Sequence, residues 1–212
     1  MMIKNLIWDL DGTLFDTYPA FTQAFVSALA GYDHFVDQAY VLRLARIGLG
    51  HCTTKLATRY DLAEEDIMQA FQAEYSRIDI EKQMLMPGAL DVCKFILSNS
   101  GVNVIVTHRG KKSTLALLQT HGVQHLFQDL ITGDHGFPRK PDPAGIEAII
   151  QRNNLAEDDS LVVGDRELDA EAGKLAGVRT CILGDGDQNT TTTFHVSNLH
   201  ELFAILLVEN AE

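Results

Sequence analysis

Short apolar runs alternate with amphipathic segments over most of the chain, and this alternation predicts an α/β fold. Ile3 to Leu10 is an apolar run that ends in an Asp-Gly turn signal, so it predicts a short buried strand. After Pro87-Gly88, strand and helix patterns alternate to residue 183. Further strands are expected at 102–107, 130–132, 160–164 and 179–183. We therefore expect a parallel sheet of βαβ units with helices on both faces.

Residues 16–86 show helical periodicity and no strand pattern. Pro19 suits the first turn of a helix. A one-sided apolar face follows from Phe21 to Leu29, and a second spans 67–78. Shorter helices are expected on either side of Gly48-Leu49-Gly50. The sequence thus predicts an all-helical domain at 16–86, inserted into a core formed by 1–15 and 87–212. The polar stretch 185–193 is expected to be a connecting loop.

Four polar clusters lie just past predicted strands. They are Asp9-Leu10-Asp11-Gly12-Thr13, Thr107-His108-Arg109, Arg139-Lys140-Pro141-Asp142-Pro143 and Gly164-Asp165-Arg166-Glu167-Leu168-Asp169. The carboxyl ends of parallel strands meet at one edge of a sheet, and ligands bind there in open α/β sheets. We therefore expect the four clusters to converge although they are far apart in sequence.

The acidic residues of these clusters predict a divalent cation. Asp9 and Asp11 are two apart on an extended segment and point the same way. Neighbouring carboxylates repel unless a proton or a cation joins them, and Asp165 adds a third acid. Mg²⁺ suits such oxygen ligands because it binds one or two carboxylates, substrate phosphate and water. The alternative for Asp9 and Asp11 is a turn whose side chains cap local amides. An EF-hand does not fit, because Ala20 stands where the loop needs its bidentate Glu.

As a set, the four clusters resemble the motifs of the haloacid dehalogenase-like hydrolase superfamily, in order and spacing over nearly the whole chain. The resemblance implies a Rossmann-like core with a helical type I cap at 16–86. It also implies a hydrolase that acts on phosphoric monoesters through an aspartyl-phosphate.

The resemblance assigns a role to each matching residue. Asp9 corresponds to the nucleophile and Asp11 to the general acid–base. Thr107 and Lys140 correspond to the residues that hold the phosphoryl group. Mg²⁺ is expected on Asp9, Asp11 and Asp165, with Asp169 as a supporting carboxylate of the metal shell. Taken singly, Lys140 could be a solvated loop charge, Asp169 an acid of a first helical turn and Thr107 a strand-end residue.

His108 is a departure from the family pattern, since many relatives have Asn or Ser after the motif Thr. We expect it to contact the substrate or a cap residue, or else to be solvated.

The identity of particular residues narrows the choice of subgroup. Haloacid dehalogenases lack the second motif acid, so Asp11 argues against halide removal. β-Phosphoglucomutase relatives have a His twelve positions after the nucleophile, where this chain has Phe21. Asp16-Thr17-Tyr18-Pro19 resembles the corresponding segment of phosphoglycolate phosphatase-like members. We therefore expect a phosphatase of this kind. A sugar phosphomutase and a non-catalytic binding protein on the same scaffold remain alternatives.

Substrate choice is expected to depend on the helical insert. Arg46 adjoins the Gly48-Leu49-Gly50 break and could bind a second anionic group of a small phosphorylated metabolite. The alternative is that Arg46 belongs to a solvated helix face.

Composition adds limits on partners and location. The formal net charge of −12 argues against nucleic acid, which would be repelled. We expect no membrane span and no secretory leader, because no apolar run is long enough and the N-terminal run is interrupted by acids. The three cysteines have no metal-ligand spacing and favour reduced core thiols. A cytoplasmic monomer or homodimer is expected.

Overall fold

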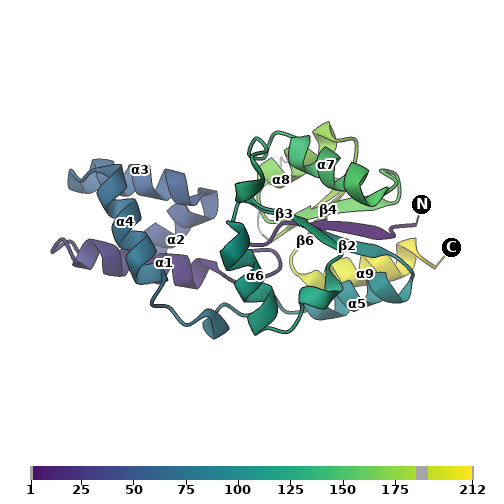
Figure 1. Ribbon diagram of the computed structural model, residues 1–212, viewed down its shortest axis with the longest axis horizontal. Helices are drawn as coiled ribbons and strands as arrows, with labels where there is room; N and C mark the ends of the chain where they lie inside the picture. Colours follow the sequence, from purple (N-terminus) through teal and green to yellow (C-terminus); the bar gives the residue numbers. More distant parts are fainter. Residues whose placement is uncertain (1, 185–190, 212) are drawn as a thin grey trace. The chain divides into compact units, whose positions relative to one another are not determined.

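The computed structural model describes residues 2–184 and 191–211, and they form two compact units (Figure 1). The core unit comprises Met1–Phe15 and Leu85–Glu212, and the helical unit comprises Asp16–Met84. Each unit has its own hydrophobic interior.

The core unit contains a six-stranded sheet in the order β3-β2-β1-β4-β5-β6, in which every neighbouring pair is parallel. The strands are β1 (Asn5–Trp8), β2 (Val102–Val106), β3 (Asp129–Ile131), β4 (Ser160–Gly164), β5 (Arg179–Leu183) and β6 (Phe194–Val196). The predicted Rossmann-like parallel sheet is therefore confirmed.

Helices cover both faces of this sheet (Figure 1). They are α5 (Ala89–Ser98), α6 (Lys111–Thr120), α7 (Ala144–Asn153), α8 (Glu167–Leu175) and α9 (Leu199–Glu209), with 3₁₀ turns η2 (Gln124–Leu126) and η3 (Gly133–His135). The α7 and α8 helices cover one face and α5 and α9 the other. A strand covered on both faces buries both sets of side chains, which explains the continuous apolar runs in the sequence.

The central strand β1 is shorter than the apolar run that predicts it. The amide of Asp9 still donates to Val163 O on β4 at 2.8 Å. At Leu10 the chain turns, and Leu10 O accepts from the amides of Leu14 and Phe15 at 3.0 Å each. The turn leaves the side chains after β1 at the carboxyl edge of the sheet.

The C-terminal elements β6 and α9 are absent from the sequence-based expectation. The β6 strand has only three residues, and α9 is apolar on nearly every side, so neither shows a clear periodicity. Of the loop expected at 185–193, residues 185–190 lie outside the described part of the chain. The remaining residues of this loop, 191–193, contact β5, because the Thr193 amide donates a hydrogen bond to Thr180 O at 3.0 Å.

The helical unit contains α1 (Tyr18–Ala30), α2 (Gln38–Ile47), α3 (Leu49–Tyr60) and α4 (Glu64–Tyr75), followed by the 3₁₀ turn η1 (Ile80–Lys82). Its interior includes the stacked rings of Phe25 and Phe71, whose centroids are 4.2 Å apart. Gly48 joins α2 directly to α3 at a φ of 155°, a value that side chains disfavour. In the part of the chain that the structure describes, no helix has both the length and the apolar character needed to span a bilayer.

Candidate active site

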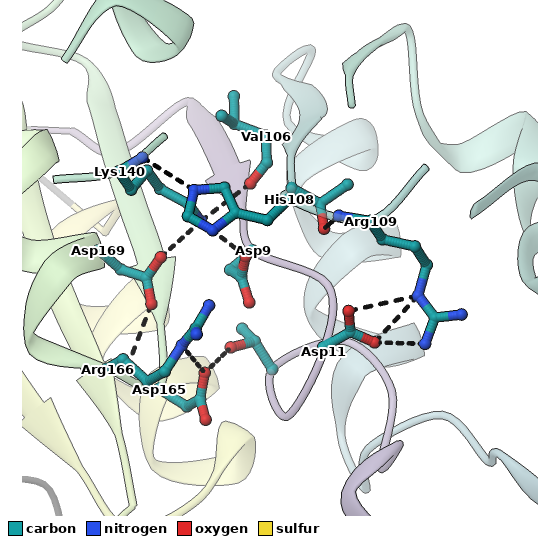
Figure 2. Close-up of polar contacts among 11 residues, drawn as sticks. Asp9, Asp11, Val106, His108, Arg109, Lys140, Asp165, Arg166 and Asp169 are labelled. Carbon is teal, nitrogen blue, oxygen red and sulfur yellow. Dashed lines mark hydrogen bonds and ion pairs between the residues drawn. The ribbon is translucent and has the colours of Figure 1, made fainter. Parts of the chain in front are cut away.

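The structure brings the four polar clusters together at the carboxyl edge of the sheet (Figure 2). Asp9 and Asp11 follow β1, Thr107 to Arg109 follow β2, and Asp165 follows β4. Lys140 lies in the loop before α7, and its side chain extends to Asp9, which follows β1.

Lys140 bridges two buried carboxylates. Its Nζ atom donates to Oδ1 of Asp9 at 2.6 Å, to Oδ1 of Asp169 at 2.5 Å and to Val106 O at 3.0 Å. Lys140 is 6% exposed and Asp9 is 3% exposed. All three N–H bonds of the ammonium therefore have protein partners, which fixes its position. Because one cation faces two acids, the group keeps an excess of negative charge when all three are ionised.

Burial and charge act in opposite directions on these groups. Burial raises the pKa of Asp9 to about 6, although the adjacent Lys140 ammonium lowers it. For Lys140, burial alone would lower the pKa, but the carboxylates of Asp169 and Asp9 outweigh burial and raise it. Lys140 is therefore held as a cation. A further positive charge near Asp9 would favour the ionised carboxylate.

The acidic residues form a cluster that could hold a cation. Oxygen atoms of Asp9, Asp165 and Asp169 lie within 4.8 Å of one another. Among residues 2–184 and 191–211, Oδ2 of Asp9 has no hydrogen-bond partner although it is shielded from solvent. A buried carboxylate oxygen without a donor is costly, so a cation or another ligand is needed to compensate it.

Gly164 allows the close approach that forms this cluster. A Cβ atom at residue 164 would lie 2.3 Å from Cβ of Asp169, closer than real side chains come. Asp169 itself is fully buried in the first turn of α8, and its Oδ2 accepts from the Arg166 amide at 3.2 Å. Because residue 164 is glycine, α8 can approach the end of β4 closely enough for Asp169 to contact Lys140.

Thr107 is buried at the end of β2. Its Oγ1 accepts from the amide of Arg109 at 3.1 Å, which leaves the hydroxyl hydrogen available to donate. The turn from 107 to 109 packs tightly, because the Gly133 amide donates to Arg109 O at 2.9 Å and a Cβ on Gly133 would come within 2.6 Å of His108 O.

His108 has a partner that the sequence did not suggest. Its Nε2 accepts from the main-chain amide of Lys140 at 2.8 Å, so this nitrogen carries no proton. Burial, together with the Lys140 and Arg139 charges, lowers the pKa of His108 to about 4. A neutral imidazole therefore anchors the backbone of Lys140, as Figure 2 shows.

Arg109 pairs with Asp11, a contact that the sequence did not indicate. Its Nε and Nη2 atoms donate to Oδ1 of Asp11 at 3.1 and 2.7 Å. The arginine side chain is 6% exposed and the aspartate side chain 20% exposed. The Asp11 carboxylate is thus turned toward Arg109 and lies outside the three-carboxylate cluster (Figure 2). The signal available in the sequence was the place of Arg109 in the second polar cluster.

Residues 6–183 match the family model of the haloacid dehalogenase-like hydrolases. The chain belongs to this family. The expected superfamily and the expectation of a hydrolase are thereby confirmed.

Several known proteins align with most of this haloacid dehalogenase-like hydrolase. A phosphoglycolate phosphatase of Rhodospirillum rubrum is 31% identical over 196 residues, which cover 87% of this chain and 81% of that protein. A hydrolase from Streptococcus pneumoniae TIGR4 is 27% identical and superimposes with a TM-score of 0.68, covering 97% of this chain and 99% of the other. A candidate phosphatase from Clostridium difficile has a TM-score of 0.86 at 16% identity, covering 98% and 100%, and shows the same fold.

Arg46, the remaining predicted site residue, belongs to the helical unit of this hydrolase. It lies in the last turn of α2 and is exposed. Its guanidinium carbon is 6.0 Å from the ring centroid of Tyr18, the first residue of α1. Arg43, one turn earlier, is also exposed and lies over the ring of Tyr40 at 5.8 Å. The two arginines therefore differ in the aromatic ring that each contacts.

Proposed function

We propose that this chain is a Mg²⁺-dependent phosphatase that transfers the phosphoryl group of a small phosphate monoester to Asp9. The observation that carries the proposal is the buried pair of Asp9 and Lys140, in which one carboxylate oxygen is bound and the other has no donor among the described residues. A carboxylate fixed in this way is oriented for attack and is not neutralised at both oxygens.

The residues fit a bound magnesium ion. Mg²⁺ prefers oxygen ligands, and the cluster of Asp9, Asp165 and Asp169 offers carboxylates together with the unpartnered Oδ2 of Asp9. Asp9 and Asp165 would bind the ion, and Asp169 would support them while it holds Lys140. Asp11 was also expected as a ligand, but its carboxylate is paired with Arg109 and is not part of the three-carboxylate cluster. When bound, the ion would neutralise charge on the transferring phosphoryl oxygens.

The first half-reaction uses Asp9 and Asp11. A carboxylate oxygen of Asp9 attacks phosphorus and forms a P–O bond while the bond from phosphorus to the ester oxygen breaks. Asp11 gives its proton to that leaving oxygen, so the product is a neutral alcohol. Lys140 and the Thr107 hydroxyl stabilise the negative charge of the phosphoryl group during transfer.

The second half-reaction releases phosphate. Asp11, now ionised, takes a proton from a water molecule that attacks the phosphorus of the aspartyl-phosphate. The bond between phosphorus and the Asp9 oxygen breaks, which regenerates the Asp9 carboxylate and frees inorganic phosphate. Asp11 is protonated again and ready for the next ester.

The name of a relative and the residues of the helical unit support a proposal for the substrate class. The R. rubrum relative is named phosphoglycolate phosphatase, and phosphoglycolate combines a phosphate with a carboxylate. We propose a substrate of this kind, with Arg46 as the residue that binds the second anion. β-Phosphoglucomutase relatives have a His at the position of Phe21. Here Phe21 is a buried core residue of the helical unit that contacts Phe71 and Tyr75, which favours a phosphatase over a sugar phosphomutase. The cytoplasmic location and the monomeric or homodimeric state stay predictions.

A screen of phosphorylated metabolites, with Mg²⁺ or with a chelator, tests this function. We expect the wild-type protein to release inorganic phosphate from small carboxylated phosphate esters only when Mg²⁺ is present. The Asp9→Asn variant should release none. Isomerised sugar phosphate would indicate a mutase. No turnover of any ester, with a partner protein still bound, would indicate a binding protein and contradict the proposal.

A further inference from the structure

The ion pair between Arg109 and Asp11 is asymmetric. Oδ1 of Asp11 receives two hydrogen bonds, from Nη2 at 2.7 Å and Nε at 3.1 Å, whereas Oδ2 receives one longer bond from Nε at 3.3 Å. The better-bonded oxygen is therefore Oδ1. The Asp11 side chain keeps 20% of its surface exposed, so the protein does not enclose it fully.

The position of Arg109 is itself fixed from several directions. Its amide donates to Thr107 Oγ1 at 3.1 Å, and its carbonyl accepts from the Gly133 amide at 2.9 Å. Its side chain is nearly buried. The same turn thus sets the phosphate-binding Thr107 and the guanidinium that holds Asp11, so the two groups keep a constant spacing.

We propose that Arg109 is a positioning residue that anchors Oδ1 of Asp11 and reserves Oδ2 for proton transfer. This inference rests on the proposed phosphatase function. A protonated carboxyl group retains its carbonyl oxygen as an acceptor, so Oδ1 keeps its bonds to Arg109 when Oδ2 carries the proton. The proton then passes from Oδ2 to the leaving oxygen, and later from water back to Oδ2. Both half-reactions use one fixed carboxyl orientation.

The leaving group distinguishes this role from general support of the site. Alkyl phosphates expel a strongly basic oxygen that needs a proton, whereas 4-nitrophenyl phosphate expels a weakly basic one that does not. The parameter kcat/KM reports the step that cleaves the ester. If Arg109 acts through Asp11, its loss should lower kcat/KM for alkyl phosphates more than for 4-nitrophenyl phosphate.

The test compares Arg109→Gln, Arg109→Lys and Asp11→Asn in the full chain on both types of ester. General acid–base catalysis contributes about 10²- to 10⁴-fold, so we expect Arg109→Gln to lower kcat/KM for the alkyl ester by roughly 10- to 100-fold. The loss for 4-nitrophenyl phosphate should be no more than about threefold. Arg109→Lys should be intermediate, since it retains the charge but loses the planar pair of donors. Arg139→Gln removes an exposed cation near the site and serves as the control.

The double variant gives a second readout. Once Asp11 is Asn, adding Arg109→Gln should change kcat/KM by less than about twofold, because residues that act together are not additive. Equal losses for both esters, or multiplicative losses in the double variant, would overturn the positioning role. Retained turnover in Asp9→Asn would instead overturn the proposed function, so the two failures are distinguishable. Arg109→Lys preserves the cation and keeps the test valid if Arg109→Gln fails to fold.

Discussion

The Nζ atom of Lys140 lies 2.6 Å from Oδ1 of Asp9, and both residues are buried. They are 131 positions apart in sequence, so the contact depends on the whole core unit. The same ammonium also binds Asp169. This three-membered group sets one cation against two buried carboxylates and fixes the position of the ammonium.

Replacement of Lys140 by Met should destabilise the core unit. It leaves Asp9 and Asp169 buried together without their cation, and loss of one partner of a buried pair costs about 3–5 kcal/mol. Urea unfolding followed by the fluorescence of Trp8, a buried residue of β1, measures this. In chelator, we expect the Lys140→Met variant to be less stable than the wild type. In Mg²⁺, part of the lost stability should be recovered, because a bound cation would offset the charge of the two carboxylates. An unchanged midpoint in chelator would contradict the buried pair.

His108→Asn should change how stability depends on pH. The pKa of His108 falls from its ordinary 6.5 to about 4 in the folded chain, so the unfolded chain binds the proton more readily. The stability that neutral His108 contributes is present in full above pH 6.5. It is lost as the pH falls from 6.5 through 4. Asn can accept from the Lys140 amide but does not titrate, so the variant should lose less free energy of unfolding over this range.

Denaturant unfolding between pH 7 and pH 4.5 tests that difference, with the exposed His125→Asn as control. A stability difference between wild type and His108→Asn that stays constant across the range would show that His108 is not held neutral by the fold.

Gly164→Ala should disrupt the acidic cluster. The new methyl group would lie 2.3 Å from Cβ of Asp169, so β4 and α8 would have to separate. Overpacking of this kind costs about 1–3 kcal/mol or more, and Asp169 would move away from Lys140. We expect a lower midpoint in the Trp8 transition and a loss of phosphatase activity. Gly50→Ala meets no atom within 4 Å and should leave both unchanged. Equal behaviour of the two variants would contradict the close packing.

Arg46→Ala should raise the KM for a carboxylated phosphate ester and leave kcat nearly unchanged. Loss of a charge-assisted hydrogen bond costs about 1.5–3 kcal/mol, which corresponds to roughly a 10- to 100-fold change. For an ester without a second anion, the effect should be small. Arg43→Ala, on the same helix, is the matched control. An unchanged KM for every good substrate would exclude Arg46 from substrate binding.

The sequence predicted the position of a site residue where that position depends only on the residue following a parallel strand. Asp9, Thr107 and Asp165 each follow a strand, and parallel strands place such residues at one edge. The partner of His108 could not be predicted, because the Lys140 amide reaches it only through the fold of the loop before α7. The pairing of Arg109 with Asp11 depends in the same way on a turn packed against Gly133. The β6 strand is too short to show the alternation by which strands are recognised.

Trapping of the phosphoenzyme tests the central proposal most directly. The protein is mixed with a small phosphate ester and Mg²⁺, quenched in acid, and treated with borohydride, which reduces an acyl phosphate to an alcohol. Peptide mass spectrometry then locates the reduced residue. We predict homoserine at position 9 alone, formed only with substrate and absent when the quench follows full turnover. Rapid turnover without modification at position 9, or full turnover by Asp9→Asn, would contradict it.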